Sequence, residues 1–186
     1  MAQLAFIATL LAGCASGLRI QTDYDHTADF SQYETYNFFN PMGIESPNYS
    51  SIYGAIFRDA IGKEMASRGY TLSDNPDLLI NVSGRLQDKT RVTTKPYGTG
   101  GYYGYRRGAY GAWGGYGYGY GDTTQVRNYT EGTINVDIVD REQKRMIWEG
   151  VAVGRVNEKS SNEKKRANIY AGIKEIFAAY PFRVSQ

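Results

Sequence analysis

The chain has 186 residues, of which 41% are hydrophobic and 14% aromatic; this is enough for one domain with a core and excludes a purely disordered chain. The formal net charge is only +2 and acidic and basic residues are interleaved, so charge gives no general drive toward nucleic acid or an anionic membrane surface. The single cysteine, Cys14, excludes an intrachain disulfide.

The N-terminal run, residues 1–11 (MAQLAFIATLL), is apolar and uncharged. It is too short for a transmembrane helix, which needs about 20 residues, but it has the length of the apolar core of a signal peptide. The following residues 11–14 (LAGC) resemble the lipobox of bacterial lipoproteins, in which the chain is cut between Gly13 and Cys14 and the thiol is acylated. No Lys or Arg precedes Cys14, which departs from the usual start of such a signal. The alternative is a buried N-terminal segment with an ordinary core cysteine.

The lipobox resemblance implies a division of the chain. Residues 1–13 would be a lipoprotein signal peptide, residues 14–29 a lipidated N-terminus with a polar tether, and residues 30–186 a single folded domain. Two or three acyl chains on Cys14 would give stable membrane attachment. Because residue 15 is Ala and not Asp, the sorting rule of such lipoproteins implies the periplasmic face of the outer membrane.

The first elements expected in the domain are a strand and a helix. Residues 32–39 (QYETYNFF) are rich in aromatic side chains and predict a strand. Residues 49–68 predict a helix that is capped by Asn48 or Ser50 and ends in a left-handed residue at Gly69. The apolar face of this helix comprises Ile52, Ile56, Phe57, Ala60, Ile61 and Met65.

Three further strands are expected after a turn at the Asn-Pro pair of residues 75–76. Residues 78–86 alternate between two faces, and their polar continuation, 88–95, can extend as an arm. Residues 123–140 predict the returning strand, and 146–156 predict its hairpin partner after a polar turn at 141–144. The side chains expected on the buried faces of the first two of these strands are Leu78, Ile80, Val82 and Leu86, and Ile134, Val136 and Ile138.

The last expected element is a helix over residues 162–180. Ser160 and Glu163 resemble a capping box at its start, and Pro181 ends it. Its apolar stripe comprises Ile169, Ile173, Ile176, Phe177 and Tyr180. The order strand-helix-strand-strand-strand-helix predicts an α+β fold in which both helices cover one face of a mostly antiparallel four-stranded sheet.

Residues 97–121 (YGTGGYYGYRRGAYGAWGGYGYGYG) form a low-complexity insert between two of the expected strands. Glycine maximises the entropy lost on ordering, so this segment cannot build a core, and we expect a flexible loop at the tip of the hairpin. The side chains that would contact a partner or a glycan are Tyr102, Tyr103, Tyr105, Arg106, Arg107, Tyr110, Trp113, Tyr116, Tyr118 and Tyr120.

Several interpretations of this insert stay open. Its tyrosines can stack on sugar rings of peptidoglycan or surface glycan, or on an envelope protein. Arginines among aromatic residues are also typical of segments that bind single-stranded nucleic acid, but export would remove that partner, so no nucleic acid is expected. Tracts of this kind can self-associate. A further alternative is an inert insertion at a loop tip.

Candidate catalytic or metal-binding residues are few. The lone histidine, His26, lacks a nearby Cys or second His for zinc. Asp23, Asp25 and Asp29 lack the glycine turn and terminal glutamate of a calcium loop. The carboxylates at predicted turns, where such groups commonly cap the backbone, are Asp74, Asp77 and Asp140. We therefore expect no catalytic residue, no metal site and no cofactor.

Several segments together resemble the bacterial lipoprotein family known as domain of unknown function 4136. They are residues 29–36 (DFSQYETY), 75–78 (NPDL), 132–140 (GTINVDIVD), 147–150 (IWEG), and the closing helix with Ile173, Ile176, Phe177, Tyr180 and Pro181. The resemblance implies an α+β envelope lipoprotein and transfers no catalytic residue, because the family has no established site. Inserts rich in tyrosine and glycine are common before the hairpin in such proteins.

Two functional hypotheses follow. The first is a lipid-anchored, non-enzymatic envelope protein with a structural or accessory binding role, in which the aromatic insert contacts a partner. The alternative is a protein that binds a small ligand, or a hydrolase, with a pocket between the helices and the sheet.

Overall fold

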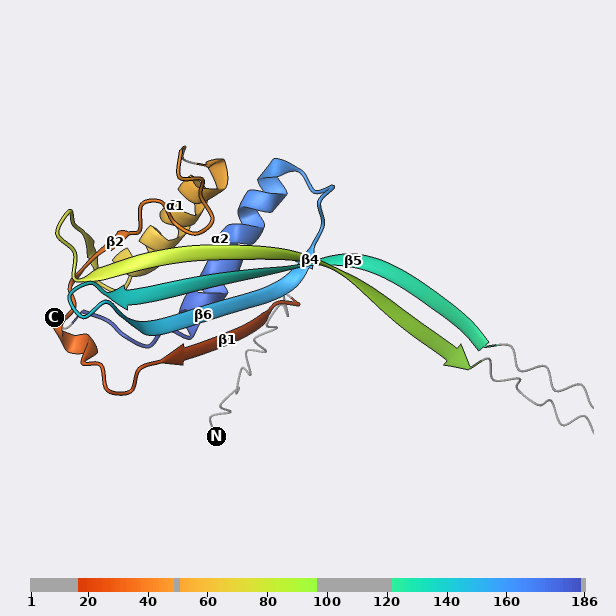
Figure 1. Ribbon diagram of the computed structural model, residues 1–186, viewed down its shortest axis with the longest axis horizontal. Helices are drawn as coiled ribbons and strands as arrows, with labels where there is room; N and C mark the ends of the chain where they lie inside the picture. The colour runs from red at the N-terminus through yellow and green to blue at the C-terminus, as the bar shows by residue number, and fades with distance from the viewer. Residues whose placement is uncertain (1–16, 49–50, 97–121, 185–186) are drawn as a thin grey trace, which may run out of the picture. The chain divides into compact units, whose positions relative to one another are not determined.

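The computed structural model describes residues 17–48, 51–96 and 122–184 (Figure 1). The elements in chain order are β1 (Arg19–Tyr24), a single 3₁₀ turn η1 (Phe30–Gln32), β2 (Thr35–Phe38), α1 (Ile52–Ala66), β3 (Thr71–Leu72), β4 (Leu78–Pro96), β5 (Asp122–Asp140), β6 (Arg145–Val156) and α2 (Asn162–Ala178). The chain divides into two compact units. The packed unit is Met1–Gln87 with Thr130–Gln186, and the hairpin unit is Asp88–Tyr129.

The strands form one mixed six-stranded sheet in the order β1-β6-β5-β4-β2-β3. β1 and β5 both pair with β6 in the antiparallel sense, whereas β2 runs parallel to β3 and β4. The α+β class is confirmed, but the expected four-stranded, mostly antiparallel sheet is wrong. Parallel neighbours need a crossover connection, and α1 provides it between β2 and the two strands that follow.

One of the additional strands, β1, lies in the segment expected to be a polar tether. Its six residues pair with β6 from Arg19 opposite Val153 to Tyr24 opposite Trp148. Only Ile20 is partly buried in this edge strand, so the sequence lacks the alternation of apolar residues that marks a half-buried strand. The expectation of a tether over residues 14–29 is therefore wrong for residues 19–24.

The helices bury one face of the sheet. α2 contacts β6 and β1, and α1 contacts α2 and β3; in Figure 1 both helices pass behind the sheet. The expected buried faces of β4, β5 and α2 are confirmed except that Ile134 and Ile169 are only partly buried and Leu86 is exposed. In α1, the expected position of Ile52 on the buried face is wrong, since its side chain is 77% exposed. The fully buried large side chains are Trp148, Phe177, Met42, Ile61, Met65, Leu78, Ile80, Ile138, Ile147, Ile173, Ile176 and Val82.

The approach of α2 to the sheet depends on Gly150 of β6. A Cβ atom at this position would lie 2.4 Å from Ile176 Cγ2 and 2.4 Å from the Trp148 ring. Trp148 in turn packs against the rings of Phe177 and Tyr180, with centroid separations of 5.6 and 5.1 Å. The helix–sheet interface is filled with side chains at this point.

The helix ends differ from the expected ones by up to three residues, since α1 spans 52–66 and not 49–68, and α2 ends at 178 and not at 180. Ser51, and not Asn48 or Ser50, caps α1 and accepts a hydrogen bond from the Gly54 N–H at 2.8 Å. α2 is capped by Ser161 where Ser160 was expected. Both serine runs offer adjacent hydroxyls, and sequence spacing alone cannot choose between them. The left-handed residue after α1 is confirmed, because Gly69 has φ of +92°.

In the hairpin unit, the strand expected to continue through residues 88–95 does so, since β4 ends at Pro96. Thr90 Oγ1 lies 3.0 Å from Asn128 Oδ1 of β5. None of the side chains whose burial is described in this unit is buried, and Val92 and Val126 are 60% and 61% exposed. The unit is a β-hairpin without a core of its own among these residues.

Candidate functional site

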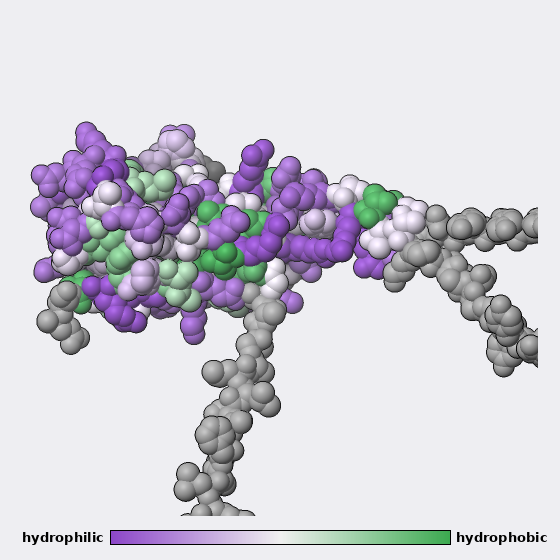
Figure 2. Space-filling model, turned by 90° about the horizontal axis from the view of Figure 1, so that it is seen from below, coloured by the Kyte–Doolittle hydropathy of each residue, from purple (hydrophilic) through white to green (hydrophobic). Residues whose placement is uncertain are grey.

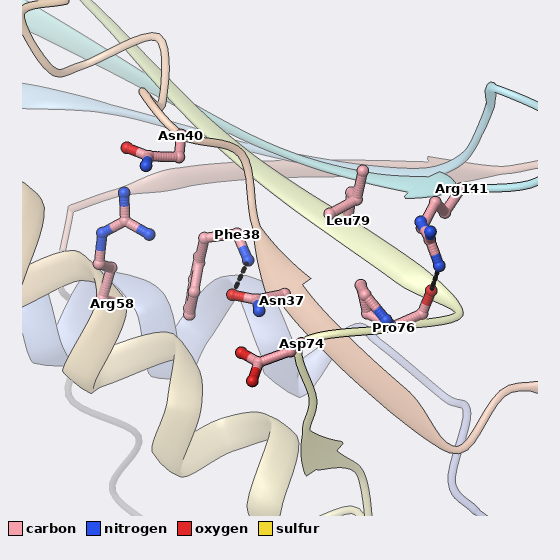
Figure 3. Close-up of a pocket in the computed structure, with 8 residues that line it drawn as sticks. All are labelled: Asn37, Phe38, Asn40, Arg58, Asp74, Pro76, Leu79 and Arg141. Atoms are coloured by element: carbon pink, nitrogen blue, oxygen red, sulfur yellow. Dashed lines mark hydrogen bonds between the residues drawn. The ribbon is translucent and has the colours of Figure 1, made fainter.

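The candidate site is a groove in the packed unit, where α1 faces the edge of the sheet formed by β2 and β3. Two adjoining cavities make up this groove and share Asn37, Phe38 and Arg58. The first has a volume of about 460 Å³ and is drawn in Figure 3. Its lining comprises Asn37, Phe38, Asn40, Arg58, Asp74, Pro76, Leu79 and Arg141.

Asn37 links β2 to the β3–β4 connection through hydrogen bonds of its side chain. Its Nδ2 donates a hydrogen bond to the Ser73 carbonyl at 2.7 Å, and its Oδ1 accepts one from the Phe38 N–H at 2.8 Å. β3 contains only two residues, so the side chain of Asn37 continues the pairing where the strand has already ended. This bond sets where Asp74 and Pro76 lie beside the cavity (Figure 3).

Arg58 of α1 provides one positive charge, which is partly neutralised within the site. Its Nη2 lies 2.6 Å from Glu45 Oε2 and donates to the Phe39 carbonyl at 3.2 Å. The guanidinium also lies 5.1 Å from the centroid of the Phe38 ring, and in Figure 3 it points toward the Asn40 side chain. Arg58 is therefore fixed in position with part of its surface exposed to the groove.

The partner of Arg58, Glu45, is a buried carboxylate with only 3% of its side chain exposed. Burial alone would raise its pKa, but the hydrogen bonds from Arg58 and from the Met42 N–H outweigh burial and hold the pKa below the ordinary value. Glu45 thus remains ionised near neutral pH and keeps Arg58 in place.

Arg141 provides the second positive charge, at the opposite end of the first cavity. Its Nη1 donates to Asn75 Oδ1 and, at 3.3 Å, to the Pro76 carbonyl (Figure 3). The Arg141 backbone N–H donates to the Asp77 carbonyl at 3.0 Å. Both acceptors of the guanidinium are neutral, whereas the carboxylate of Asp74 lines the same cavity and that of Asp77 lies close enough for the charge of Arg141 to lower its pKa.

Asp77 fastens the same corner of the sheet. One of its carboxylate oxygens accepts hydrogen bonds from the Glu34 N–H, the Thr35 N–H and the Thr35 hydroxyl at 3.0, 2.9 and 2.7 Å. Burial raises the pKa of this carboxyl, but the hydrogen bonds lower it by more than burial raises it. The pKa therefore lies below its ordinary value. The expected capping role of Asp77 is confirmed, although its partners are Thr35 at the start of β2 and Glu34 directly before it, and not groups in its own turn.

The second cavity runs along α1 and has a volume of about 620 Å³. Ala55, Gly62 and Ala66 are small residues of α1 that leave this space open, and Leu72 of β3 borders it with an exposed side chain. Lys63 Nζ lies 2.7 Å from Asp59 Oδ2, and the Tyr170 hydroxyl also contacts that carboxylate. The groove thus continues from a polar end to a more apolar stretch.

This arrangement can hold a polar or anionic group by hydrogen bonds and charge. Nucleophilic catalysis would need a hydroxyl or thiol within hydrogen-bond reach of a base. The residues that line the two cavities offer carboxylates only at Asp74 and Asp59, and Asp59 is engaged by Lys63 and Tyr170. Across the described ranges, no group of three or more His, Cys, Asp or Glu side chains is placed to hold a metal ion. None of the helices in these ranges is both long and apolar enough to span a bilayer.

The site residues predicted from sequence fall elsewhere. Gly13, Cys14 and all ten aromatic or basic residues of the insert lie outside the described residues. His26 packs against the ring of Tyr24 at a centroid distance of 4.2 Å. Asp25 pairs with Arg145 at 3.2 Å, and Asp29 caps η1 by accepting from the Ser31 N–H. These acids of the expected tether therefore have local structural partners.

The residues that line the groove are not among the site residues predicted from the sequence. Asn37, Arg58 and Arg141 are separated by 21 and 83 positions in the sequence, and each has the appearance of an ordinary surface residue. No local pattern joins them, because the crossover through α1 brings them together only in the folded sheet.

Two helices against one face of a mixed six-stranded sheet define an α+β domain with a groove at its parallel edge. The chain belongs to the DUF4136 family, a domain of unknown function, whose match covers residues 20–182. No curated protein matches the chain.

Solved structures with a similar fold include a PDZ domain protein from Parabacteroides distasonis, with a TM-score of 0.52 and 13% identity. That similarity covers 89% of this chain and 36% of the other, so the chain spans about a third of that protein. Two crystal forms of the PelC dodecamer from Paraburkholderia phytofirmans give TM-scores of 0.46 and 0.45 at 8% identity, covering 91% of this chain and 99% of theirs. The similarity to the PDZ domain protein concerns the fold alone.

Proposed function

We propose that the protein is a lipid-anchored envelope protein on the periplasmic face of the outer membrane, with a non-enzymatic structural or accessory binding role. The observation that carries this proposal is the sequence LAGC at residues 11–14, directly after an apolar run of signal-peptide length. Acylation of Cys14 would consume the only thiol of the chain.

The position of β1 supports the same proposal. β1 begins five residues after Cys14, so the two Cα atoms can be at most about 18 Å apart. An anchor at Cys14 would therefore hold the packed unit next to the membrane surface and not at the end of a long tether. A domain held in this way is suited to contacting other components of the envelope.

The intact mass of the protein from the membrane fraction tests the anchor, alongside a Cys14→Ser variant. We expect the wild-type mass to equal residues 14–186 plus acyl chains, and we expect the variant to remain uncleaved or to become soluble. A cytosolic protein that retains Met1 and a free thiol would contradict the proposal. The arginine-bearing insert would then need a nucleic-acid binding assay.

The accessory role is proposed to involve the aromatic insert of residues 97–121, whose two ends are held by β4 and β5. Deleting the insert should leave the packed unit folded, because among the residues that the structure describes no buried side chain belongs to the hairpin unit. The deletion should weaken co-sedimentation with peptidoglycan or with an envelope protein. Unchanged co-sedimentation of a correctly folded deletion variant would favour an inert insert.

Binding of a small polar or anionic ligand in the groove is the second candidate, and the charge of Arg141 beside a cavity of about 460 Å³ favours it. Inorganic phosphate and citrate are suitable probes. If either raises the midpoint of thermal unfolding, Arg141→Ala should abolish the increase, whereas the exposed Arg183→Ala should not. An equal increase of the unfolding midpoint in both variants would rule out the Arg141 end of the groove as the binding site.

A further inference from the structure

The beginning of β1 marks the end of the packed unit at which the N-terminal part of the chain joins the fold. Leu18, directly before β1, fits between β6 and α2: its side chain occupies the space that a Cβ atom on Gly154 would need, at 2.4 Å, and lies 3.8 Å from a Cβ atom on Gly172. Arg19 pairs with Val153, three residues before β6 ends. The β6–α2 connection and the first turns of α2 therefore lie at this same end.

Basic side chains gather at this end. We call Arg19, Arg155, Lys159, Lys164 and Lys165 the basic end surface. The five cations of this surface lie among three carboxylates, those of Glu131, Glu158 and Glu163, which leaves a net charge of +2. Figure 2 shows hydrophilic side chains next to a hydrophobic patch near the point where the described chain begins. The charge balance of the chain thus conceals one locally positive surface.

Most of these cations are exposed, although Arg19 and Arg155 have partners within the fold. Arg19 has 71% of its side chain exposed while its Nη2 lies 3.1 Å from Glu131 Oε2. Arg155, Lys159 and Lys164 are exposed and Lys165 is half-buried. Lys164 and Lys165 lie in the first turns of α2, where the helix dipole disfavours positive charge. A partner with negative charge would explain why cations occupy these positions.

We propose that the basic end surface binds the anionic phospholipid headgroups of the membrane that holds the anchor, and so fixes the orientation of the packed unit. This proposal rests on the lipid anchor proposed above. Leu18 is the fourth residue after Cys14, so the two Cα atoms are at most about 14 Å apart. The Debye length is about 8–10 Å at physiological ionic strength, so the field of the headgroups is weakened but not lost over a distance of at most about 14 Å. Acyl chains supply the affinity, and the cations select which face meets the bilayer.

The test uses the full protein, purified from membranes with its lipid and reconstituted in vesicles. A Ser160→Cys substitution places a thiol in the β6–α2 connection, and since Cys14 is acylated this thiol alone takes up a polarity-sensitive dye. The vesicles are phosphatidylcholine alone or phosphatidylcholine with phosphatidylglycerol, each at low and high salt. A Gln143→Cys variant labels the β5–β6 turn, at the other end of β6, as the positional control.

We expect the dye at position 160 to shift to the blue only in vesicles with phosphatidylglycerol at low salt, and the dye at 143 not to shift. The double variant Lys159→Glu/Lys164→Glu should reduce the headgroup-bound fraction about fivefold for each cation lost. The matched variant Lys144→Glu/Lys174→Glu changes net charge equally at exposed positions outside the surface and should retain the shift.

The two proposals fail in different ways. A mass without acyl chains would contradict the lipid anchor, and this mass is measured on every preparation before labelling. An acylated protein whose dye at position 160 responds equally to both vesicle types would overturn the inference about headgroups while leaving the anchor intact. Equal loss of the shift in both charge variants would overturn it as well, since net charge and not this surface would then be responsible.

Discussion

β4 and β5 each pass through both units of the molecule, and their two halves differ in what surrounds them. In the packed unit, Leu78, Ile80 and Val136 are completely buried against the helices. In the hairpin unit, Val92 and Val126 have the same strand-forming tendency but are mostly exposed. The comparison teaches that strand propensity makes both halves extended, whereas burial alone makes one half stable. A two-stranded hairpin without a core is marginal in water.

The largest expected effect comes from removing the centre of the packed unit. Trp148→Ala deletes a side chain that is 1% exposed and packs on Phe177 and Tyr180, so the free energy of unfolding should fall by about 3–5 kcal/mol. Urea unfolding followed by far-UV circular dichroism measures the change. Leu86→Ala, which shortens an exposed side chain of β4, should change stability by less than about 0.5 kcal/mol. Similar losses of unfolding free energy in both variants would show that burial does not distinguish the two positions.

A second pair of variants tests how closely α2 packs on the sheet. Gly150→Ala places a methyl group 2.4 Å from Ile176 Cγ2 and should cost about 1–3 kcal/mol through overpacking. In Gly172→Ala the nearest atom is 3.8 Å away, so the higher helix propensity of alanine should raise stability by up to about 1 kcal/mol. Opposite signs in thermal unfolding are expected. Destabilisation by both substitutions would mean that α2 packs too closely for an added methyl group both at Gly150 of β6 and at Gly172 of α2.

The pH dependence of stability tests a buried polar group of the packed unit. Asp140 accepts hydrogen bonds from the Tyr33 hydroxyl and the Gln143 N–H, each at 2.7 Å. Burial raises the pKa of its carboxyl, but these bonds outweigh burial and place the pKa below its ordinary value of 3.8. The folded state therefore binds fewer protons than the unfolded state, and the resulting stability is present above pH 4 and is lost as the pH falls through the folded pKa.

Asp140→Asn removes this contribution and should cost about 1–3 kcal/mol at neutral pH. The difference between wild type and variant should shrink toward pH 2, which urea unfolding at a series of pH values measures. The hairpin-unit variant Thr90→Val removes an exposed hydrogen bond to Asn128 and should show no such dependence. A constant difference between wild type and Asp140→Asn across the pH range would contradict the role of the carboxylate.

The smallest effect is expected in the hairpin unit itself. Val92→Ala with Val126→Ala should change the global free energy of unfolding by less than about 0.5 kcal/mol, because both side chains are already exposed to water. Amide hydrogen exchange sharpens the comparison further. Residues 88–94 and 124–129 should exchange much faster than residues 78–82 and 134–138 of the same two strands. Equal protection would indicate a stabilising partner for the hairpin.

Much of the fold could be predicted because its buried faces follow simple periods. Leu78, Ile80 and Val82 alternate, and Ile173, Ile176 and Phe177 recur at helical spacing, so β4 and α2 were predictable. β1 was not predictable, because it is an exposed edge strand in which only Ile20 is partly buried, so no alternation of apolar residues indicates a strand. The parallel placement of β2 depends on the crossover through α1, which no local pattern encodes.

The candidate site was less predictable than the fold. Cys14 was identified because a lipobox is a local pattern, and the insert because its composition is unusual. Arg58 and Arg141, by contrast, become neighbours of one cavity only after the chain has folded. Likewise, the basic end surface combines the start of β1 with the start of α2, and its charge is hidden in the balanced composition of the whole chain.

The place of β1 at the edge of the sheet also has a mechanical consequence. Any tension applied to the chain near Cys14 is transmitted first to β1, which is attached to the sheet through one ladder of six residue pairs with β6. Within β1 only Ile20 is partly buried, so this strand can be pulled from the edge while Trp148 and the residues around it stay covered by α2. In a force experiment the protein would therefore lengthen by one strand before its core yields.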